Sequence, residues 1–496
     1  MVAPDTERTK KTYGLNLPDG LGTTRFLLTR EEFLESLRDG RQILAPDGTM
    51  IEDPTTHPLT SAGISTIAKY YEMQHDPKFA DIMTFESSEL GGRASLAWKT
   101  PRSEEDLRRK RKLLELSTNL TLGSFGRPPD YGAIQSAGLL QIIDRIEDSR
   151  AENVRAFAQL GLRHNLMSTD LIADVQSDRS VPPSQKPGRL RVVSESDDGI
   201  VVYGAKPCNS IMVQGHVGAL LTLLSPGMDM DSAIFAVVPA NLPGLTFVPR
   251  ESALRPGAPG DRPVSTFIGD EVDALMVFDN VFIPAENIFS LRNENVLGTY
   301  NERGALPQWH ILARMGYRAR ILAGLADMVV SVLGTDRIPQ VRDSVADIAA
   351  YAQTILAFIV AAEQSGHLQN GVYVPSQEFL LPGRLYAIET YPRIVQTLRD
   401  LCGQGLVSRF TSKQFSDERI GGFLDEFLPG TGVTAADKNR LFNLVWEVTC
   451  SEQSMRAGLF ETLNATPPGA IRNYLYNIDR SNWADPVRDL LKESAQ

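Results

Sequence analysis

The pattern of hydrophobic and polar positions predicts a helical segment in the first third of the chain. Residues 103–106 read S-x-x-D, the spacing of a helix N-cap motif. Leu113, Leu116 and Leu120 then recur on one face at helical spacing. A basic run at 108–112 lies within this helix and is flanked by acids. Two interpretations of the run stay open: a solvated helix face, or a patch that binds phosphate.

The middle of the chain has short β-branched runs instead. Two such runs within 188–214 are joined by Asp197-Asp198-Gly199, which is the signature of a β-hairpin. Further short runs within 232–250 and 274–289 are cut by proline and glycine. Strands that cluster without alternating helices predict an antiparallel sandwich or barrel.

Helical spacing returns after about residue 300, as the positions of Ile348, Ile355 and Ile359 indicate. With 496 residues, the chain is too long for one ordinary hydrophobic core. We therefore predict an α+β protein of three units. These are an N-terminal helical domain at 1–155, a central β domain at 156–292 and a C-terminal helical bundle at 293–496.

Composition and charge narrow the class of protein. A hydrophobic content of 42% with 22% charged residues is typical of a soluble globular protein. The net charge of −11 argues against nucleic acid as a partner, because phosphate binding needs a basic surface. The polar N-terminus and the lack of an apolar run near ~18 residues predict neither a signal peptide nor membrane insertion. Three cysteines that lie far apart favour a reducing cytoplasm.

Several familiar catalytic sites are absent from the sequence. It has no G-x-S-x-G elbow, no H-E-x-x-H and no Walker A loop. The six histidines are scattered without metal-ligand spacing, so we predict no metal site. The stretch GTGVTA at 430–435 follows Leu428-Pro429 rather than a strand, which indicates a glycine turn before a helix and not a dinucleotide site.

The stretch GRPPDYG at 126–132 interrupts the helical first third. A residue before proline is pushed away from helical geometry, so Arg127 and Pro128 should be extended. Pro129 suits the first turn of a new helix that would run through Tyr131. On spacing alone, the stretch is either a joint between two helices or part of a built site.

The wider sequence around this stretch resembles the oxygenase component of the 4-hydroxyphenylacetate 3-monooxygenase family. The likeness runs through THPL at 56–59, SDR at 177–179, VFDNVFIPAENIF at 277–289 and SEQSMRAGLFE at 451–461. It covers nearly the whole chain in the same order. The combination of G-R-x-P-D-Y, D-D-G-I-x-V-x-G-A-K and V-x-I-P-x-E-N is fairly specific.

This resemblance implies an acyl-CoA-dehydrogenase-like fold with a central β-barrel or sandwich and a C-terminal four-helix bundle, assembled as a homotetramer. It also implies a two-component flavin monooxygenase. Such an enzyme takes reduced FAD (FADH2) from a separate NAD(P)H:flavin reductase and reacts it with O2 to a C4a-hydroperoxide. It then hydroxylates a small aromatic or heteroaromatic substrate. The missing nucleotide-binding motif is consistent with electrons that arrive as diffusible reduced flavin.

The resemblance also assigns catalytic residues. The family arginine and tyrosine match Arg127 and Tyr131, which would supply positive charge and a hydrogen bond to the reacting oxygen. A family histidine contacts substrate and flavin. Alignment without gaps places Leu166 at that position, and a small gap would place His164 there. If the histidine is lost, a substrate that is already nucleophilic would need no such base.

The flavin-binding residues implied by the resemblance lie in four segments. Each serine among them also has a simpler interpretation as a turn hydroxyl, and Asp178-Arg179 could be a surface ion pair. The matching residues are Met167, Ser168, Gln176, Ser177, Asp178, Arg179, Ser210, Ser454, Met455 and Arg456.

Two other functions stay open at this stage. The same scaffold serves acyl-CoA-dehydrogenase-like flavin oxidoreductases and flavin–iron–sulfur dehydratases. The dehydratases place cluster-binding cysteines near the positions of Arg127 and Tyr131, whereas this chain has no cysteine before Cys208. The other function is a catalytically silent scaffold, which would be favoured if Leu166 closes the pocket.

Overall fold

A computed structural model describes residues 14–255, 257–464, 466–478 and 480–495 of the chain. Its first part is mainly helical, as predicted. Two short strands form a hairpin between helices α4 and α5. The elements are α2 (Arg30–Ser36), β1 (Gln42–Ile43), α3 (Ser61–Met73), α4 (Pro77–Met83), β2 (Thr84–Ser87), β3 (Gly92–Ser95), α5 (Glu104–Leu120), α6 (Tyr131–Gln141) and α7 (Asp148–His164).

Helix α5 begins where the N-cap motif predicts. The Ser103 hydroxyl accepts the backbone N–H of Asp106, and acids occupy the first turn. The basic run on this helix is only partly solvated, which corrects the interpretation that the whole run is a solvated helix face. Lys110 is buried, and its ammonium donates to the carbonyl oxygens of Leu96 and Ala97 at 2.9 and 2.6 Å. Burial lowers the pKa of Lys110 to about 7.

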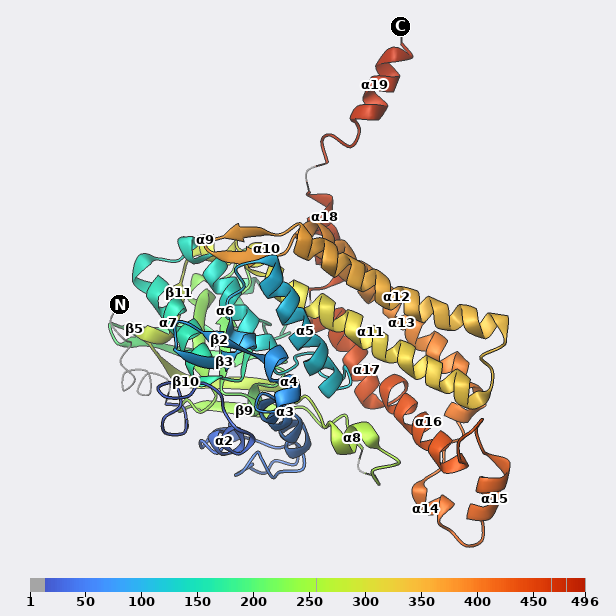
Figure 1. Ribbon diagram of the computed structural model, residues 1–496. Helices are drawn as coiled ribbons and strands as arrows, with labels where there is room; N and C mark the ends of the chain where they lie inside the picture. The colour runs from blue at the N-terminus through green and yellow to red at the C-terminus, as the bar shows by residue number, and fades with distance from the viewer. Residues whose placement is uncertain (1–13, 256, 465, 479, 496) are drawn as a thin grey trace.

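The central part consists of two sheets, most of whose strands are green in Figure 1, and β1 from the first part of the chain joins one of them. One sheet has the order β1-β9-β10-β6-β5 and the other β11-β8-β7-β4. The predicted hairpin is confirmed as β5 and β6, which pair antiparallel around the Asp197-Asp198 turn. The strands are β4 (Ser168–Leu171), β5 (Arg191–Ser196), β6 (Gly199–Lys206), β7 (Val217–Leu221), β8 (Ile234–Pro239), β9 (Leu245–Pro249), β10 (Ala274–Pro284) and β11 (Ile288–Leu291).

Each sheet is antiparallel except at one edge, where β1 pairs parallel with β9 and β4 pairs parallel with β7. Parallel pairs need long connections, and both pairs here join strands that are far apart in the chain. Val202 and Phe247 of the first sheet share one hydrophobic core with Leu220 and Val238 of the second. Ala219 and Val237 on the other face of the second sheet pack into the core of the N-terminal helices. The second sheet is therefore buried on both faces.

The last part is helical again, as predicted. Its long helices α11, α12 and α13 lie side by side in Figure 1, and α16 packs against α11 and α13. The remaining elements of the described chain are α8 (Pro263–Phe267), α9 (Glu294–Leu297), α10 (Tyr300–Arg303), α11 (Ala305–Leu333), α12 (Pro339–Gln364), β12 (His367–Gln369), β13 (Val372–Val374), α13 (Gln377–Cys402), α14 (Ser412–Phe415), α15 (Gly421–Phe427), α16 (Ala435–Thr449), α17 (Glu452–Leu459), α18 (Pro468–Tyr476) and α19 (Asp485–Glu493).

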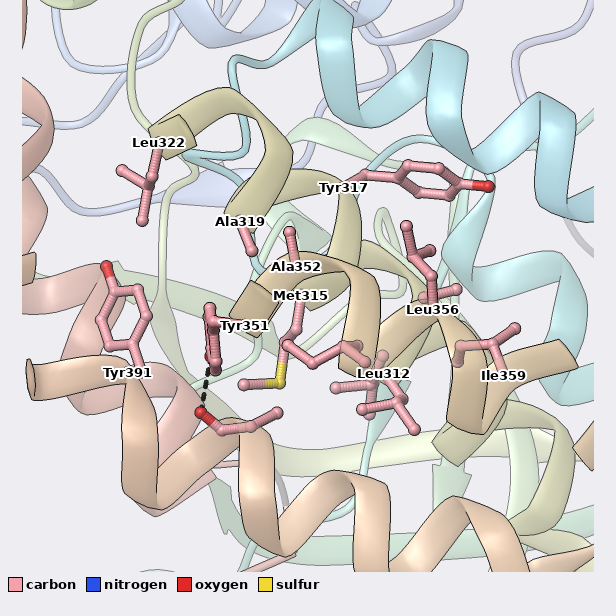
Figure 2. Close-up of a cluster of buried hydrophobic side chains, with 14 of the residues drawn as sticks. Leu312, Met315, Tyr317, Ala319, Leu322, Tyr351, Ala352, Leu356, Ile359 and Tyr391 are labelled. Carbon is pink, nitrogen blue, oxygen red and sulfur yellow. Dashed lines mark hydrogen bonds between the residues drawn. The ribbon is translucent and has the colours of Figure 1, made fainter. Parts of the chain in front are cut away.

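Figure 2 shows how the bundle packs. Leu312 and Met315 of α11 meet Tyr351 and Leu356 of α12 and Tyr391 of α13 in one buried cluster. The hydroxyl of Tyr351 donates to a backbone carbonyl of α13 at 2.7 Å, so this buried phenol is satisfied. By length and composition, α12 alone among the described helices could cross a membrane, but its apolar face belongs to this core.

Candidate active site

The GRPPDYG stretch forms a turn whose backbone is held by a carboxylate from a distant part of the sequence. Glu271 lies between α8 and β10 and is fully buried. Its two oxygens accept the backbone N–H groups of Gly126, at 2.7 Å, and Arg127. The new helix α6 begins at Tyr131, after a turn closed by the N–H of Tyr131 to the carbonyl of Pro128. The stretch is thus both a joint and an anchored loop.

The side chains of this stretch meet a third residue, Asp170 of β4. Arg127 Nε lies 3.3 Å from one oxygen of Asp170, and the Tyr131 hydroxyl donates to the other at 2.7 Å. Gln135, one helical turn after Tyr131, donates to the same oxygen at 2.9 Å. The Arg127 guanidinium stacks between the rings of Tyr131 and Phe460, with centroids at 4.1 and 5.0 Å. All five side chains are buried.

The cluster holds one charged arginine beside a neutral phenol. Burial alone would lower the pKa of Arg127, but the nearby Asp170, Tyr131 and Glu271 outweigh burial and raise it. Burial also raises the pKa of Tyr131 far above its usual value, with Arg127 opposing the shift. At neutral pH, Arg127 is therefore a cation and Tyr131 is a hydrogen-bond donor.

A second network of ion pairs also involves Glu271. Arg456 of α17 binds Glu271 through Nη1 and Asp273 through Nε and Nη2, at 2.5 to 2.8 Å. The hydroxyl of Ser210 donates to Asp273 at 2.5 Å. Burial opposes ionisation of Asp273, but Arg456 and Arg250 lower its pKa to about 2. Ser210, Arg456 and the GRPPDYG loop are thus held in one buried ionic network.

Comparison with known proteins identifies the family. The model of the 4-hydroxyphenylacetate 3-hydroxylase N-terminal part matches residues 29–290, and that of the C-terminal part matches residues 299–492. The chain belongs to the 4-hydroxyphenylacetate 3-hydroxylase family. The resemblance seen in the sequence motifs is therefore confirmed.

Two relatives of this family are similar over nearly the whole chain. One is the oxygenase component of 4-nitrophenol 4-monooxygenase/4-nitrocatechol 2-monooxygenase from Rhodococcus opacus, 33% identical, covering 94% of this chain and 90% of its own length. The other is the 4-hydroxyphenylacetate 3-monooxygenase oxygenase component from Thermus thermophilus, 31% identical, covering 94% and 98%.

Solved structures of the hydroxylase family agree with the fold described above. The oxygenase component of 4-hydroxyphenylacetate 3-monooxygenase, complexed with FAD and 4-hydroxyphenylacetate, superposes with a TM-score of 0.89 at 29% identity, covering 94% of this chain and 99% of that one. A 4-hydroxybutyryl-CoA dehydratase from N. maritimus superposes with a TM-score of 0.84 at 21% identity, covering 94% and 95%. The second likeness shows a shared fold. The predicted α+β, acyl-CoA-dehydrogenase-like architecture is confirmed.

The residues near this hydroxylase-family cluster fit a flavin. The buried polar atoms without a hydrogen-bond partner among the described residues include Nη1 of Arg127 and Oγ of Ser168. Ser168 packs against α6, where its carbonyl would lie 1.8 Å from a Cβ at Gly132. A flavin ring needs donors and acceptors of this kind. Ser168 would hold it beside Arg127, and Ser210 and Arg456 lie in the adjoining network.

Other predicted flavin residues lie apart from this cluster. In the loop after β4, Gln176, Asp178 and Arg179 are exposed, and Asp178 accepts from the backbone and hydroxyl of Ser180. Ser177 is half-buried, with an unpartnered hydroxyl oxygen. The remaining three are Met167, which packs in the N-terminal core, Met455, which is exposed, and Ser454, whose hydroxyl donates to Ser451.

The structure places His164 at the end of α7, beside the N-terminal segment. Its Nδ1 lies 3.1 Å from the carbonyl oxygen of Leu160, and its ring lies against Gly22. Leu166 packs in the core, and its carbonyl accepts from Trp98. The side chain that contacts both Arg127 and Tyr131 is Asp170, which the sequence analysis missed.

A signal for Asp170 does exist in the sequence. It is a single acid inside the segment 166–173, which contains the buried strand β4, where an unpaired charge would be costly. Glu271 and Asp273 likewise stand directly before the buried strand β10. Acids in such positions indicate buried cationic partners, but the pattern does not say which ones.

Other cavities lie outside this cluster. One of about 580 Å³ is lined by the β2–β3 hairpin, α7 and the loop between β12 and β13. Its charged side chains include Lys99 and Arg155, which form ion pairs with Asp106 and Glu152. No group of three or more potential metal ligands occurs in the described part of the chain.

Proposed function

We propose that the protein is the oxygenase component of a two-component flavin monooxygenase. It would use reduced FAD and O2 to hydroxylate a phenol or a related aromatic or heteroaromatic compound. The observation that carries this proposal is the buried Arg127–Tyr131–Asp170 cluster beside unpaired polar groups that fit a flavin. The family membership supports it.

Bound FAD would supply the electrons that activate O2. The residues of the chain would bind the substrate, hold the reacting groups in place and exclude water. Arg127 offers a free Nη1 to an oxyanion of the substrate, and Tyr131 offers a neutral hydroxyl. Asp170 holds both groups in place. Burial of the cluster keeps water away from the reacting atoms.

This proposal is tested by supplying the electrons directly. Purified protein is mixed with photoreduced FAD without oxygen, and then with isotopically labelled O2 and 4-nitrophenol. We expect a hydroxylated product that carries one labelled oxygen atom, because the second atom leaves as water. Hydrogen peroxide as the only product, with flavin oxidised as fast as in free solution, would contradict the proposal.

The dehydratase alternative is not favoured by a specific observation. Cys208, Cys402 and Cys450 are all free, and none of them belongs to the Arg127 cluster.

A separate reductase is proposed as the partner, and the free thiols support the cytoplasm as location. The domain division at residues 155 and 292 also stays a proposal, and α7 runs across the first of these positions.

We propose a homotetramer, and α19 supports self-assembly. This helix projects from the body of the molecule in Figure 1. Val487, Leu490 and Leu491 lie on one face of it and are 58, 65 and 62% exposed. A stripe of this kind is typical of a helix that packs against another surface.

Replacing Leu490 and Leu491 together by aspartate should therefore weaken assembly. We expect a lower molar mass in size-exclusion chromatography with light scattering, because two charges would have to be buried in the contact. Lys492→Asp is the control on the polar face and should leave the mass unchanged. An unchanged mass in the double variant would exclude α19 from the interface.

A further inference from the structure

One buried aromatic side chain lies outside the hydrophobic cores. Phe460 is 6% exposed, yet it does not belong to the three core clusters that contain the other buried aromatic side chains of the described chain. Its ring instead lies against two guanidinium groups. The Cζ atom of Arg127 is 5.0 Å from the ring centroid, and the Cζ atom of Arg456 is 4.8 Å from it. A role in core packing therefore does not account for this phenylalanine.

The backbone that carries Phe460 is unusual and well anchored. Phe460 begins a π-helical turn, Phe460–Asn464, directly after α17. Turns of this kind are rare and often occur at functional sites. The next residue, Glu461, is buried and binds Nη1 and Nη2 of Arg314 on α11 at 2.5 and 2.7 Å. This ion pair holds the turn on the helical bundle, so that Phe460 faces the GRPPDYG loop from a fixed position.

The first glycine of the GRPPDYG stretch makes room for this ring. A Cβ atom at Gly126 would lie 2.2 Å from Cε1 and 2.4 Å from Cδ1 of Phe460. Gly126 is not among the residues with positive φ, so it is the space beside the ring that calls for glycine here. Any side chain at this position would have to push the ring of Phe460 away from its place beside Arg127.

Arg127 has few other restraints on its orientation. One hydrogen bond, from Nε to Asp170 at 3.3 Å, is long, and Nη1 has no partner among the described residues. The guanidinium also contacts two rings, with centroids at 4.1 Å for Tyr131 and 5.0 Å for Phe460. A planar guanidinium stacks well on aromatic faces. The two rings therefore limit the orientations that are open to it.

We propose that Phe460 is a positioning residue for Arg127. Its ring, together with that of Tyr131, holds the guanidinium in the orientation that leaves Nη1 free for the oxygen atom of a phenol. This role rests on the proposed function, because it concerns a phenol beside Arg127. The contact between Phe460 and Arg127 can also be measured without any phenol.

The first test measures how strongly Arg127 acts on a bound phenol. 4-Nitrophenol is added without oxygen to protein that carries reduced FAD, and its coloured phenolate is followed by absorbance as a function of pH. In the wild type, the Arg127 cation should lower the pKa of the bound phenol. Phe460→Leu should lower the ratio of phenolate to phenol roughly 10-fold at a fixed pH, the scale of a buried cation–π contact. Phe460→Tyr keeps the aromatic face and should keep most of the wild-type ratio.

A glycine substitution should act in the same way from the other side of the contact. Gly126→Ala should lower the phenolate ratio like Phe460→Leu, because the added methyl group displaces the ring. The matched control is a pair in the bundle, where a Cβ atom at Gly405 would lie 2.6 Å from Cε1 of Phe442. Gly405→Ala and Phe442→Leu should lower the thermal midpoint but leave the phenolate ratio unchanged. Equal losses of this ratio in the two pairs would overturn the positioning role.

A double-mutant cycle tests the contact in the absence of phenol. Phe460→Leu, Arg127→Met and the double variant are compared with the wild type by chemical denaturation. The loss of stability in the double variant should be smaller than the sum of the two single losses, because both changes remove the same contact.

Two outcomes would overturn the proposal. One is that the losses in the cycle are additive. The other is that Phe460→Leu keeps the phenolate ratio of a wild-type protein that does lower the pKa of 4-nitrophenol. Coupled losses in a wild-type background that leaves the pKa of 4-nitrophenol unchanged would confirm the contact and contradict the proposed function alone.

Discussion

Replacing Asp170 by asparagine is expected to lower the turnover number roughly 100- to 1,000-fold, the range seen when one preorganised electrostatic contact is lost. Asp170 fixes Arg127 through Nε and Tyr131 through its hydroxyl. Asparagine has the same shape but offers an NH2 group to one of these donors. Either Arg127 or Tyr131 must then turn away from the reacting atoms. The turnover number should fall more than KM rises, because orientation is lost rather than binding area.

A second readout separates positioning from folding. In Asp170→Asn, a larger share of the electrons of the reduced flavin should reduce O2 to hydrogen peroxide instead of forming hydroxylated product. The two products are quantified with the phenol that the wild type hydroxylates fastest. Asp174→Asn is the control, since Asp174 follows β4 and pairs with Lys206 and Arg189 outside the cluster. Wild-type coupling and turnover in Asp170→Asn would remove Asp170 from the mechanism.

Local patterns predicted the elements of this fold well. The S-x-x-D motif set the start of α5, and the Asp197-Asp198-Gly199 turn set the β5–β6 hairpin. In both cases the deciding contacts lie within a few residues of one another. The start of α6 was predicted too early, at Pro129 rather than Tyr131. The Asp130 carboxylate bonds to Ser117 and His310, which are distant in sequence, and does not cap the helix.

The sequence predicted two residues of the candidate site but not the acids that hold them. Arg127 and Tyr131 came from a motif, and the structure puts their side chains together with Asp170. Asp170 itself, and Glu271, are identified only by contacts across 43 and 144 residues of sequence. No spacing rule joins positions so far apart. His164 is the last residue of α7, whereas Asp170 lies on β4, and the contacts described for His164 are with Leu160 and Gly22.

Glu271 carries the largest expected effect on stability. Replacing it by glutamine should lower the free energy of unfolding by about 3–5 kcal/mol, which is typical when one partner of a buried ion pair is removed. Its carboxylate satisfies the N–H groups of Gly126 and Arg127 and also binds Arg456. Glutamine can accept at one oxygen, but its NH2 group would face a second donor.

Chemical denaturation of Glu271→Gln against the wild type measures this effect. Glu251→Gln is the control, because Glu251 is exposed and lies before α8 in the sequence, and it should change stability by less than about 0.5 kcal/mol. The loss in Glu271→Gln should be accompanied by loss of turnover, because that carboxylate holds the backbone N–H groups of Gly126 and Arg127 in the loop. If Glu271→Gln were as stable as the wild type, the loop would owe its position to Pro128 and Pro129, and the arginine would be placed by the backbone alone.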